Sequence, residues 1–192
     1  MRKFLLLGKT GVGKSSFINA AFGQSLARTL PFEACTKFVE YYADNTPIGN
    51  VYLIDTPGLA EGDEELDKEY LSLIRTKVDL DRLYTTIYIS RLDETRFRRD
   101  ERETLNLITS QLGAYIWNRS WLVFTFAASV PLEQRQRTFK ARAKQIVEFL
   151  QSITKRIEPD KPFQEFQAYY MTDNLVNDWS SHAVPILSVL TD

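Results

Sequence analysis

Apolar and aromatic residues gather in short runs along the chain, and longer charged segments separate these runs. Short apolar runs bounded by turn residues are typical of buried strands, whereas apolar positions that recur every three or four residues predict helices. We expect strands over residues 3–7, 38–43, 50–55, 84–90, 121–126 and 167–171. We expect helices over residues 14–22, 64–78, 99–112, 132–156 and 185–190.

The alternation of strands and helices predicts an α/β fold in three layers, with helices on both faces of a mostly parallel, six-stranded sheet. The second and third strands are the exception, because the connector DNTPIGN is too short to hold a crossover helix and therefore predicts antiparallel pairing. The chain has 192 residues, with no internal repeat and no low-complexity linker. We therefore expect residues 1–192 to form a single domain.

The composition is that of a globular protein, with 44% apolar and 26% charged residues. Its 24 basic and 25 acidic residues nearly cancel, so the net charge gives no reason to expect binding to nucleic acid or to an anionic membrane. The apolar run after MRK is too short for a signal peptide, and the single Cys35 fits a reducing compartment. We expect a cytoplasmic protein, with recruitment to a membrane left open and any membrane contact made by segments outside this chain.

A glycine-rich segment directly follows the first predicted strand and opens the first predicted helix. Residues 8–15 read GKTGVGKS and fit the phosphate-binding pattern GxxxxGK[ST]. In this pattern the glycines let backbone N–H groups curl around phosphate oxygens, Lys14 adds a positive charge, and Ser15 binds magnesium. The sequence therefore predicts a P-loop NTPase that binds its nucleotide together with Mg²⁺. The predicted phosphate-binding residues are Lys9, Thr10, Gly11, Val12, Gly13, Lys14, Ser15 and Ser16.

A second motif, DTPG, ends the third predicted strand. There Asp55 can hold magnesium through water, and the Gly58 N–H can meet the γ-phosphate. Thr36 lies just before the second predicted strand, where a switch threonine would reach both the metal and the γ-phosphate, and Thr29 is the fallback. We assign catalytic roles to Lys14, Thr36 and Gly58, and metal binding to Ser15, Asp55 and Thr36.

Several segments together resemble one family, the AIG/Toc group of septin-related GTPases, which includes the Toc receptors of the chloroplast outer membrane and the GIMAP proteins. The segments are GKTGVGKSS, CTK, LIDTPGL, RLDETRF, ITSQLGAYIWN and VFTFAAS, and they cover essentially the whole chain. The resemblance implies a G domain that binds GTP and GDP with Mg²⁺, switches between the two forms, and often forms a homodimer across the nucleotide face. Leu59 stands where many signalling GTPases carry a water-orienting glutamine, and it cannot form a hydrogen bond. Hydrolysis by the protein alone is therefore expected to be slow.

Arg96, within RLDETRF, matches the family position whose arginine reaches across the dimer toward the partner's nucleotide. A guanidinium there can neutralise charge on the transferring phosphate, so the resemblance implies a catalytic role in trans. The alternative is that Arg96 belongs to a solvated charged surface. The residues of this mixed cluster are Arg91, Arg98, Arg99, Arg102, Asp93, Glu94, Asp100, Glu101 and Glu103.

The guanine-reading Lys and Asp usual after the fifth strand are missing, because the strand ends in TFAA. The last predicted strand instead leads to Asp173 and Asn174, and Toc-like relatives carry an acidic residue followed by Asn at the matching place. A carboxylate can accept hydrogen bonds from guanine N1–H and its 2-amino group. We therefore assign base contact to Thr125, Phe126, Asp173 and Asn174. Phe126 would stack on the base, with a core aromatic as the alternative.

Three functions stay open from the sequence. The first is a GTP/GDP switch with slow hydrolysis, and the second is a nucleotide-binding scaffold with little or no turnover, which Leu59 and the bulky Thr10 support. The third is a P-loop ATPase or nucleotide kinase, which the missing Lys and Asp favour but the lack of a second substrate site opposes. His182, the only histidine, belongs to no Cys or His cluster and has no Ser partner at a spacing typical of a catalytic triad, so we expect a structural or exposed role.

Overall fold

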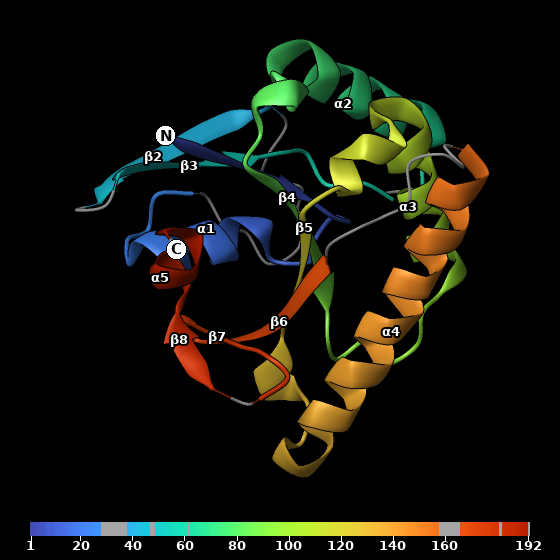
Figure 1. The fold of residues 1–192 in the computed structure, drawn as a ribbon. Helices are drawn as coiled ribbons and strands as arrows, with labels where there is room; N and C mark the ends of the chain where they lie inside the picture. The colour runs from blue at the N-terminus through green and yellow to red at the C-terminus, as the bar shows by residue number, and fades with distance from the viewer. Residues whose placement is uncertain (28–37, 47–48, 61, 158–165, 181, 192) are drawn as a thin grey trace.

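One mixed β-sheet forms the middle layer of the protein, and helices cover both of its faces (Figure 1). The strand order is β2-β3-β1-β4-β5-β6-β7-β8. The computed structural model describes residues 1–27, 38–46, 49–60, 62–157, 166–180 and 182–191.

The described strands are β1 (Arg2–Leu7), β2 (Glu40–Thr46), β3 (Gly49–Asp55), β4 (Thr85–Arg91), β5 (Ser120–Thr125), β6 (Phe166–Thr172), β7 (Leu175–Asn177) and β8 (Ala183–Pro185). The α-helices are α1 (Lys14–Phe22), α2 (Glu64–Lys77), α3 (Arg99–Leu112), α4 (Leu132–Ile157) and α5 (Ile186–Thr191). Short 3₁₀ turns lie at Leu80–Arg82, Ala114–Trp117 and Ala127–Ser129.

The centre of the sheet is parallel. Strand β1 pairs with β3 and β4, β4 pairs with β5, and β5 pairs with β6, all in the same direction. Strand β2 runs antiparallel to β3, as the short connector predicts. Because parallel strands end at a common edge, the loops after β1, β3, β4, β5 and β6 emerge on one side of the molecule.

Two apolar cores lie between the layers. One packs helices α2, α3 and α4 against the sheet, and it contains Leu71, Leu105 and Phe139. The other packs α1 and α5 against the opposite face, and it contains Phe17, Ile18 and Leu190. Figure 1 shows the same division, with α1 and α5 on one face and the three longer helices on the other. No helix among the described residues is long and apolar enough to cross a bilayer.

The α/β fold class predicted from the sequence is confirmed, but the predicted count of six strands is wrong. The segment after β6 turns at Asp173 and returns as β7 and β8, which extend the sheet antiparallel to eight strands. Both additional strands have three residues, too short for a hydrophobic period to reveal them. Strand β2 also starts later than predicted, at Glu40.

A buried ion pair joins α3 and α4 to the middle of the sheet. Arg142 Nη2 donates to Glu101 Oε2 at 2.6 Å, and both side chains are essentially inaccessible to solvent. The Ser90 hydroxyl of β4 donates to Glu101 Oε1 at 2.6 Å and accepts from Arg142 at 3.2 Å. The sequence analysis assigns Glu101 to the solvated charged surface around Arg96, and that assignment is wrong for Glu101. Its spacing to Leu105, Ile108 and Leu112 places it on the buried stripe of α3.

We predict that Arg142→Met lowers the free energy of unfolding by about 3 kcal/mol, because it leaves the Glu101 carboxylate buried without its cation. The matched control is Arg99→Met, which removes an exposed pair with Glu103 and should cost no more than about 0.5 kcal/mol. Denaturant unfolding measures both changes. The Arg142→Met, Glu101→Leu double variant should recover most of the loss, and a single variant as stable as the control would contradict this account.

Candidate nucleotide-binding site

The P-loop of residues 8–15 connects β1 to α1 at the carboxyl edge of the sheet. Gly11 and Gly13 have φ values of 75° and 92°, a left-handed backbone that favours glycine. Gly13 caps α1 without a side-chain hydrogen bond, so the N–H groups of the first helical turn face the loop. Such unpaired N–H groups at a helix N-terminus attract anions, which suits a phosphate.

Lys14 lies inside the curve of this loop. Its Nζ donates to the carbonyl oxygens of Gly8 at 3.3 Å and Lys9 at 3.2 Å. Lys14 as a whole is only 7% exposed. The carbonyl groups hold the ammonium at the mouth of the loop, where it can meet an anion. Ser16, in contrast, is exposed on the first turn of α1.

Two oxygen groups that suit magnesium lie side by side next to the P-loop. Ser15 Oγ donates to Asp55 Oδ2 at 2.8 Å, and Asp55 is fully buried at the end of β3. A hydroxyl and a carboxylate are hard oxygen ligands, and magnesium in nucleotide sites takes one or two such ligands while phosphates and water fill the rest. These two residues therefore fit a magnesium ion.

The DTPG segment is fastened to the P-loop by its backbone. Thr10 N–H donates to the Leu59 carbonyl at 2.9 Å, and Leu59 N–H donates to the Gly8 carbonyl at 3.3 Å. Gly58 lies so close to Thr10 that a Cβ would overlap the Thr10 backbone and side chain. Leu59 is 1% exposed, and its side chain belongs to the core that α2 and α3 form with the sheet.

Thr125 connects the end of β5 to the P-loop. Its hydroxyl donates to the Val12 carbonyl at 2.5 Å and lies 3.2 Å from the Ser90 carbonyl. A Cβ on Gly13 would lie 3.3 Å from the Thr125 methyl group, so the loop and the strand are in close contact. Thr125 thus holds the P-loop backbone against the carboxyl end of β5.

Phe126 stands at the surface directly after β5. It has a φ of 53°, and 40% of it is exposed, which argues against the alternative of a core aromatic. The Arg91 guanidinium lies 3.8 Å from the centre of its ring. Asp93 holds Arg91 through two bonds of 3.0 and 2.7 Å, and the pKa of Asp93 is lowered chiefly by this hydrogen bonding. No pattern in the sequence indicates that Arg91 would pack against the Phe126 ring.

Asp173 and Asn174 form the tight turn between β6 and β7, and both are exposed. Asp173 has a φ of 52°, and the Asn174 carbonyl accepts from Ile186 N–H at 3.2 Å. Because β6 is the parallel neighbour of β5, this turn emerges at the same edge as Phe126. The structure therefore brings the predicted base-contacting residues to the same edge of the sheet as the P-loop, and Thr125 among them contacts that loop.

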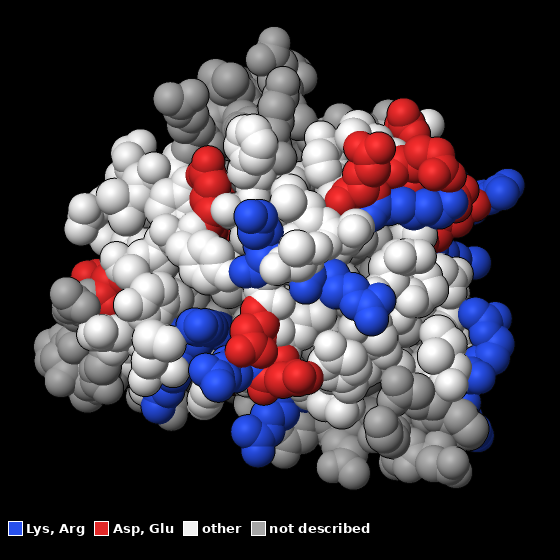
Figure 2. Space-filling view, turned by 90° about the horizontal axis from the view of Figure 1, so that it is seen from above, with Lys and Arg blue, Asp and Glu red and all other residues white. Residues whose placement is uncertain are grey.

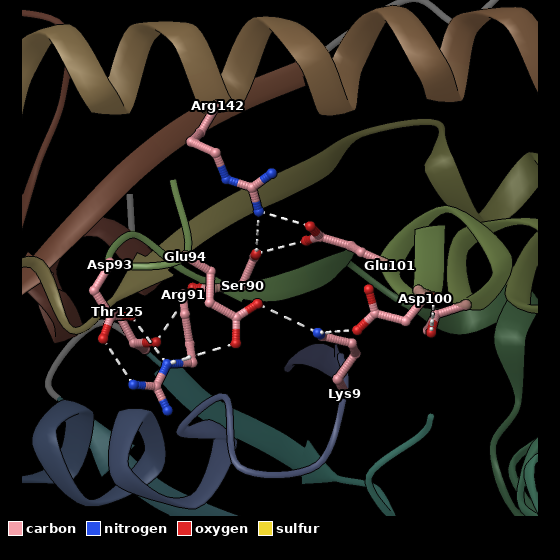
Figure 3. A network of polar contacts seen from close by, with 10 residues as sticks. Lys9, Ser90, Arg91, Asp93, Glu94, Asp100, Glu101, Thr125 and Arg142 are labelled. Carbon is pink, nitrogen blue, oxygen red and sulfur yellow. Dashed lines mark hydrogen bonds and ion pairs between the residues drawn. The ribbon is translucent and has the colours of Figure 1, made fainter. Parts of the chain in front are cut away.

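Lys9 and Arg96 differ in their surroundings. The Lys9 ammonium faces two acidic residues, Glu94 at 3.3 Å and Asp100 at 2.7 Å (Figure 3). Arg96 is exposed in the loop between β4 and α3, and it forms no hydrogen bond or ion pair with any other described residue. Thr36 and its fallback Thr29 lie outside the described residues.

The surface of the protein seen from above the view of Figure 1 carries charges of both signs. Figure 2 shows basic and acidic side chains interspersed, with one concentration of acidic groups. A cavity of about 670 Å³ between α2 and α3 is lined by Asp63, Glu64, Asp67, Asp100 and Glu103, among others. The nearly neutral net charge thus arises from mixed local patches.

Comparisons with known proteins agree with this geometry. Residues 2–160 match the model of the AIG1 family. GTP-binding protein A of Dictyostelium discoideum is 28% identical over 185 residues, which cover 88% of this chain and 41% of that protein. Translocase of chloroplast 33 of Arabidopsis thaliana is 34% identical over 140 residues, which cover 72% of this chain and 46% of the relative. The chain thus spans less than half the length of these two relatives.

Solved structures share the fold. Toc33 from Arabidopsis thaliana in complex with GDP and Mg²⁺ superimposes with a TM-score of 0.78 at 22% identity, covering 99% of this chain and 81% of that one. An arginine-to-alanine variant of Toc33, described as dimerisation-deficient, gives a TM-score of 0.78 at 23% identity with the same coverage. The match of the family model over most of the chain, together with the P-loop and DTPG geometry, shows that the chain belongs to the AIG1 family.

Proposed function

We propose that the protein is a guanine-nucleotide switch that binds GTP and GDP with Mg²⁺ and hydrolyses GTP slowly. The observation that carries this proposal is the Ser15–Asp55 oxygen pair beside the Lys14 ammonium at the mouth of the P-loop. The Lys14 ammonium and the backbone N–H groups of the first turn of α1 suit the phosphates, and the Ser15–Asp55 oxygen pair suits the metal. The Toc33 complexes with GDP or GMPPNP and Mg²⁺ support the same assignment.

In the proposed mechanism, the residues of this chain bind and orient the phosphates. Lys14 and the N–H groups of the loop would neutralise and hold the β- and γ-phosphates, and Ser15 and Asp55 would hold magnesium. When bound, magnesium would supply charge neutralisation at the phosphate oxygens. Gly58 N–H would meet the γ-phosphate, and Thr36 would act as the switch threonine.

Base choice is proposed to come from the end of β6. The Asp173 carboxylate can accept from the N1–H and 2-amino groups of guanine, whereas adenine offers no such pair of donors. Phe126 would stack on the base from the end of β5, with Asn174 beside it. The exposure of Phe126 and its location at the same edge as Asp173 support this role.

The GTP-bound form is proposed to dimerise across the nucleotide face, with Arg96 reaching the partner's nucleotide. The exposure of Arg96 at this edge and its lack of an ion-pair partner among the described residues support the proposal. A Toc33 structure described in terms of dimerisation and GTPase activity supports it too.

A second function, a nucleotide-binding scaffold with little turnover, is favoured by one observation. Leu59 is buried in the core and cannot orient an attacking water. Hydrolysis would then depend on the partner subunit, and the protein would hold GTP for long periods when monomeric.

Asp173→Ala is predicted to weaken GTP binding roughly tenfold or more, because it removes charge-assisted hydrogen bonds to guanine. The control is Asp178→Ala, whose carboxylate bonds to Ser180 instead and which should change the affinity less than twofold. Isothermal titration calorimetry measures both. Equal affinities for the two variants would refute the base-reading role of Asp173.

Arg96→Ala is predicted to weaken dimerisation in a GTP analogue about tenfold and to remove the rise in turnover at high protein concentration. The matched control is Arg99→Ala, because Arg99 is exposed nearby and pairs only with Glu103 among the described residues. Sedimentation velocity measures the dimer. If Arg96→Ala and the wild type sediment alike, Arg96 does not contribute to the interface.

Leu59→Gln is predicted not to speed hydrolysis, although it introduces the side chain that other GTPases use. The amide would instead enter the core, and it should lower the free energy of unfolding by about 2 kcal/mol. Phosphate release under single-turnover conditions, together with thermal unfolding, measures both effects. A faster reaction in a fully stable variant would show that residue 59 can face the nucleotide.

A further inference from the structure

The loop of residues 92–98, which joins β4 to α3 and carries Arg96, is fixed on both sides of its exposed tip. At its start, Leu92 N–H donates to the Thr125 carbonyl at 2.9 Å, and Arg91 is paired with Asp93. Toward its end, the Phe97 ring packs edge-on against Phe149 of α4, with ring centres 5.3 Å apart. These contacts hold the loop to the body of the domain.

A third attachment runs to the P-loop itself. Lys9 Nζ lies 3.3 Å from Glu94 Oε2 and 2.7 Å from Asp100 Oδ2. A single ammonium thus bridges Glu94, which precedes Arg96 in the loop, and Asp100, which follows it in the first turn of α3. Glu94 also lies 3.9 Å from Arg91 (Figure 3). The Arg91 guanidinium in turn lies over the ring of Phe126. The Lys9 side chain is only 13% exposed, whereas the side chains of Glu94 and Asp100 are 30% and 48% exposed.

The Lys9 side chain is well satisfied in this arrangement. Burial disfavours its charged form, but the hydrogen bond to Asp100 and the charge of Glu94 outweigh burial and raise the pKa of Lys9. Burial acts to raise the pKa of Asp100, but the hydrogen bond from Lys9 and the positive charge of Lys9 lower it. Lys9 and Asp100 therefore both stay ionised near neutral pH. Because the Lys9 ammonium is engaged by the Glu94 and Asp100 carboxylates, Lys14 is the lysine that can meet an anion at the mouth of the P-loop.

We propose that Lys9 is a positioning residue, which fixes the Arg96 loop to the P-loop and so aligns Arg96 with the nucleotide of the partner subunit. The part concerning Arg96 rests on the proposed function. In this arrangement, any shift of the P-loop backbone on nucleotide binding is passed through Lys9 to the residues on both sides of Arg96. The nucleotide site and the dimer contact are thereby coupled by one side chain.

The first test uses hydrogen exchange of the GDP-bound monomer. Lys9→Met keeps the aliphatic stem and removes the charge, and it should speed exchange in residues 92–98 roughly fivefold, while Lys9→Arg should stay near the wild type. The control is Lys68→Met, because Lys68 also bridges two carboxylates but lies on α2. Unchanged exchange in Lys9→Met would overturn the proposal, whether or not the protein dimerises.

The second test is a double-variant cycle for dimerisation at saturating GTP analogue. Lys9→Met alone should weaken the dimer about fivefold to twentyfold, and the Lys9→Met, Arg96→Ala double variant should be no weaker than Arg96→Ala alone. Additive losses would overturn an action of Lys9 through Arg96. If the wild type stays monomeric, the proposed dimer is refuted, and the exchange measurement still decides whether Lys9 fixes the loop.

Discussion

Parallel hydrogen bonding between β3, β1, β4, β5 and β6 is the constraint on which the rest of the structure depends. It makes these five strands end at one edge, so the P-loop, the DTPG segment, the Arg96 loop, Phe126 and the Asp173 turn emerge together. The helices on both faces bury the apolar strands, which is the usual condition for a parallel sheet.

Short polar contacts then join the loops at this edge into one unit. Thr125 connects β5 to the P-loop, the backbone of Leu59 connects DTPG to it, and Lys9 connects it to the Arg96 loop. Deeper in the domain, Ser90 and the buried Arg142–Glu101 pair attach β4 to α3 and α4. A ligand on the P-loop would therefore act on a preformed framework, with the coupling to a partner carried by charged side chains near the surface.

The sequence was sufficient for the local parts of this picture. Glycine spacing predicts the P-loop, and the apolar run before Asp55 predicts the strand that presents it, because both depend on neighbouring residues. The contacts between distant segments could not be predicted in the same way. Glu101 and Arg142 lie on the apolar stripes of their helices, which was a usable signal, whereas nothing in the sequence indicated that Lys9 would pair with Asp100 or that Arg91 would stack on Phe126.

The central claim is that this edge of the sheet is a guanine-nucleotide site. The most direct test is equilibrium titration of the nucleotide-free protein with GDP, GTP, ADP and ATP in the presence of magnesium. The account predicts that both guanine nucleotides bind at least about tenfold more tightly than their adenine counterparts, because only guanine offers paired donors to Asp173. Equal affinities, or tighter binding of ADP and ATP, would contradict it.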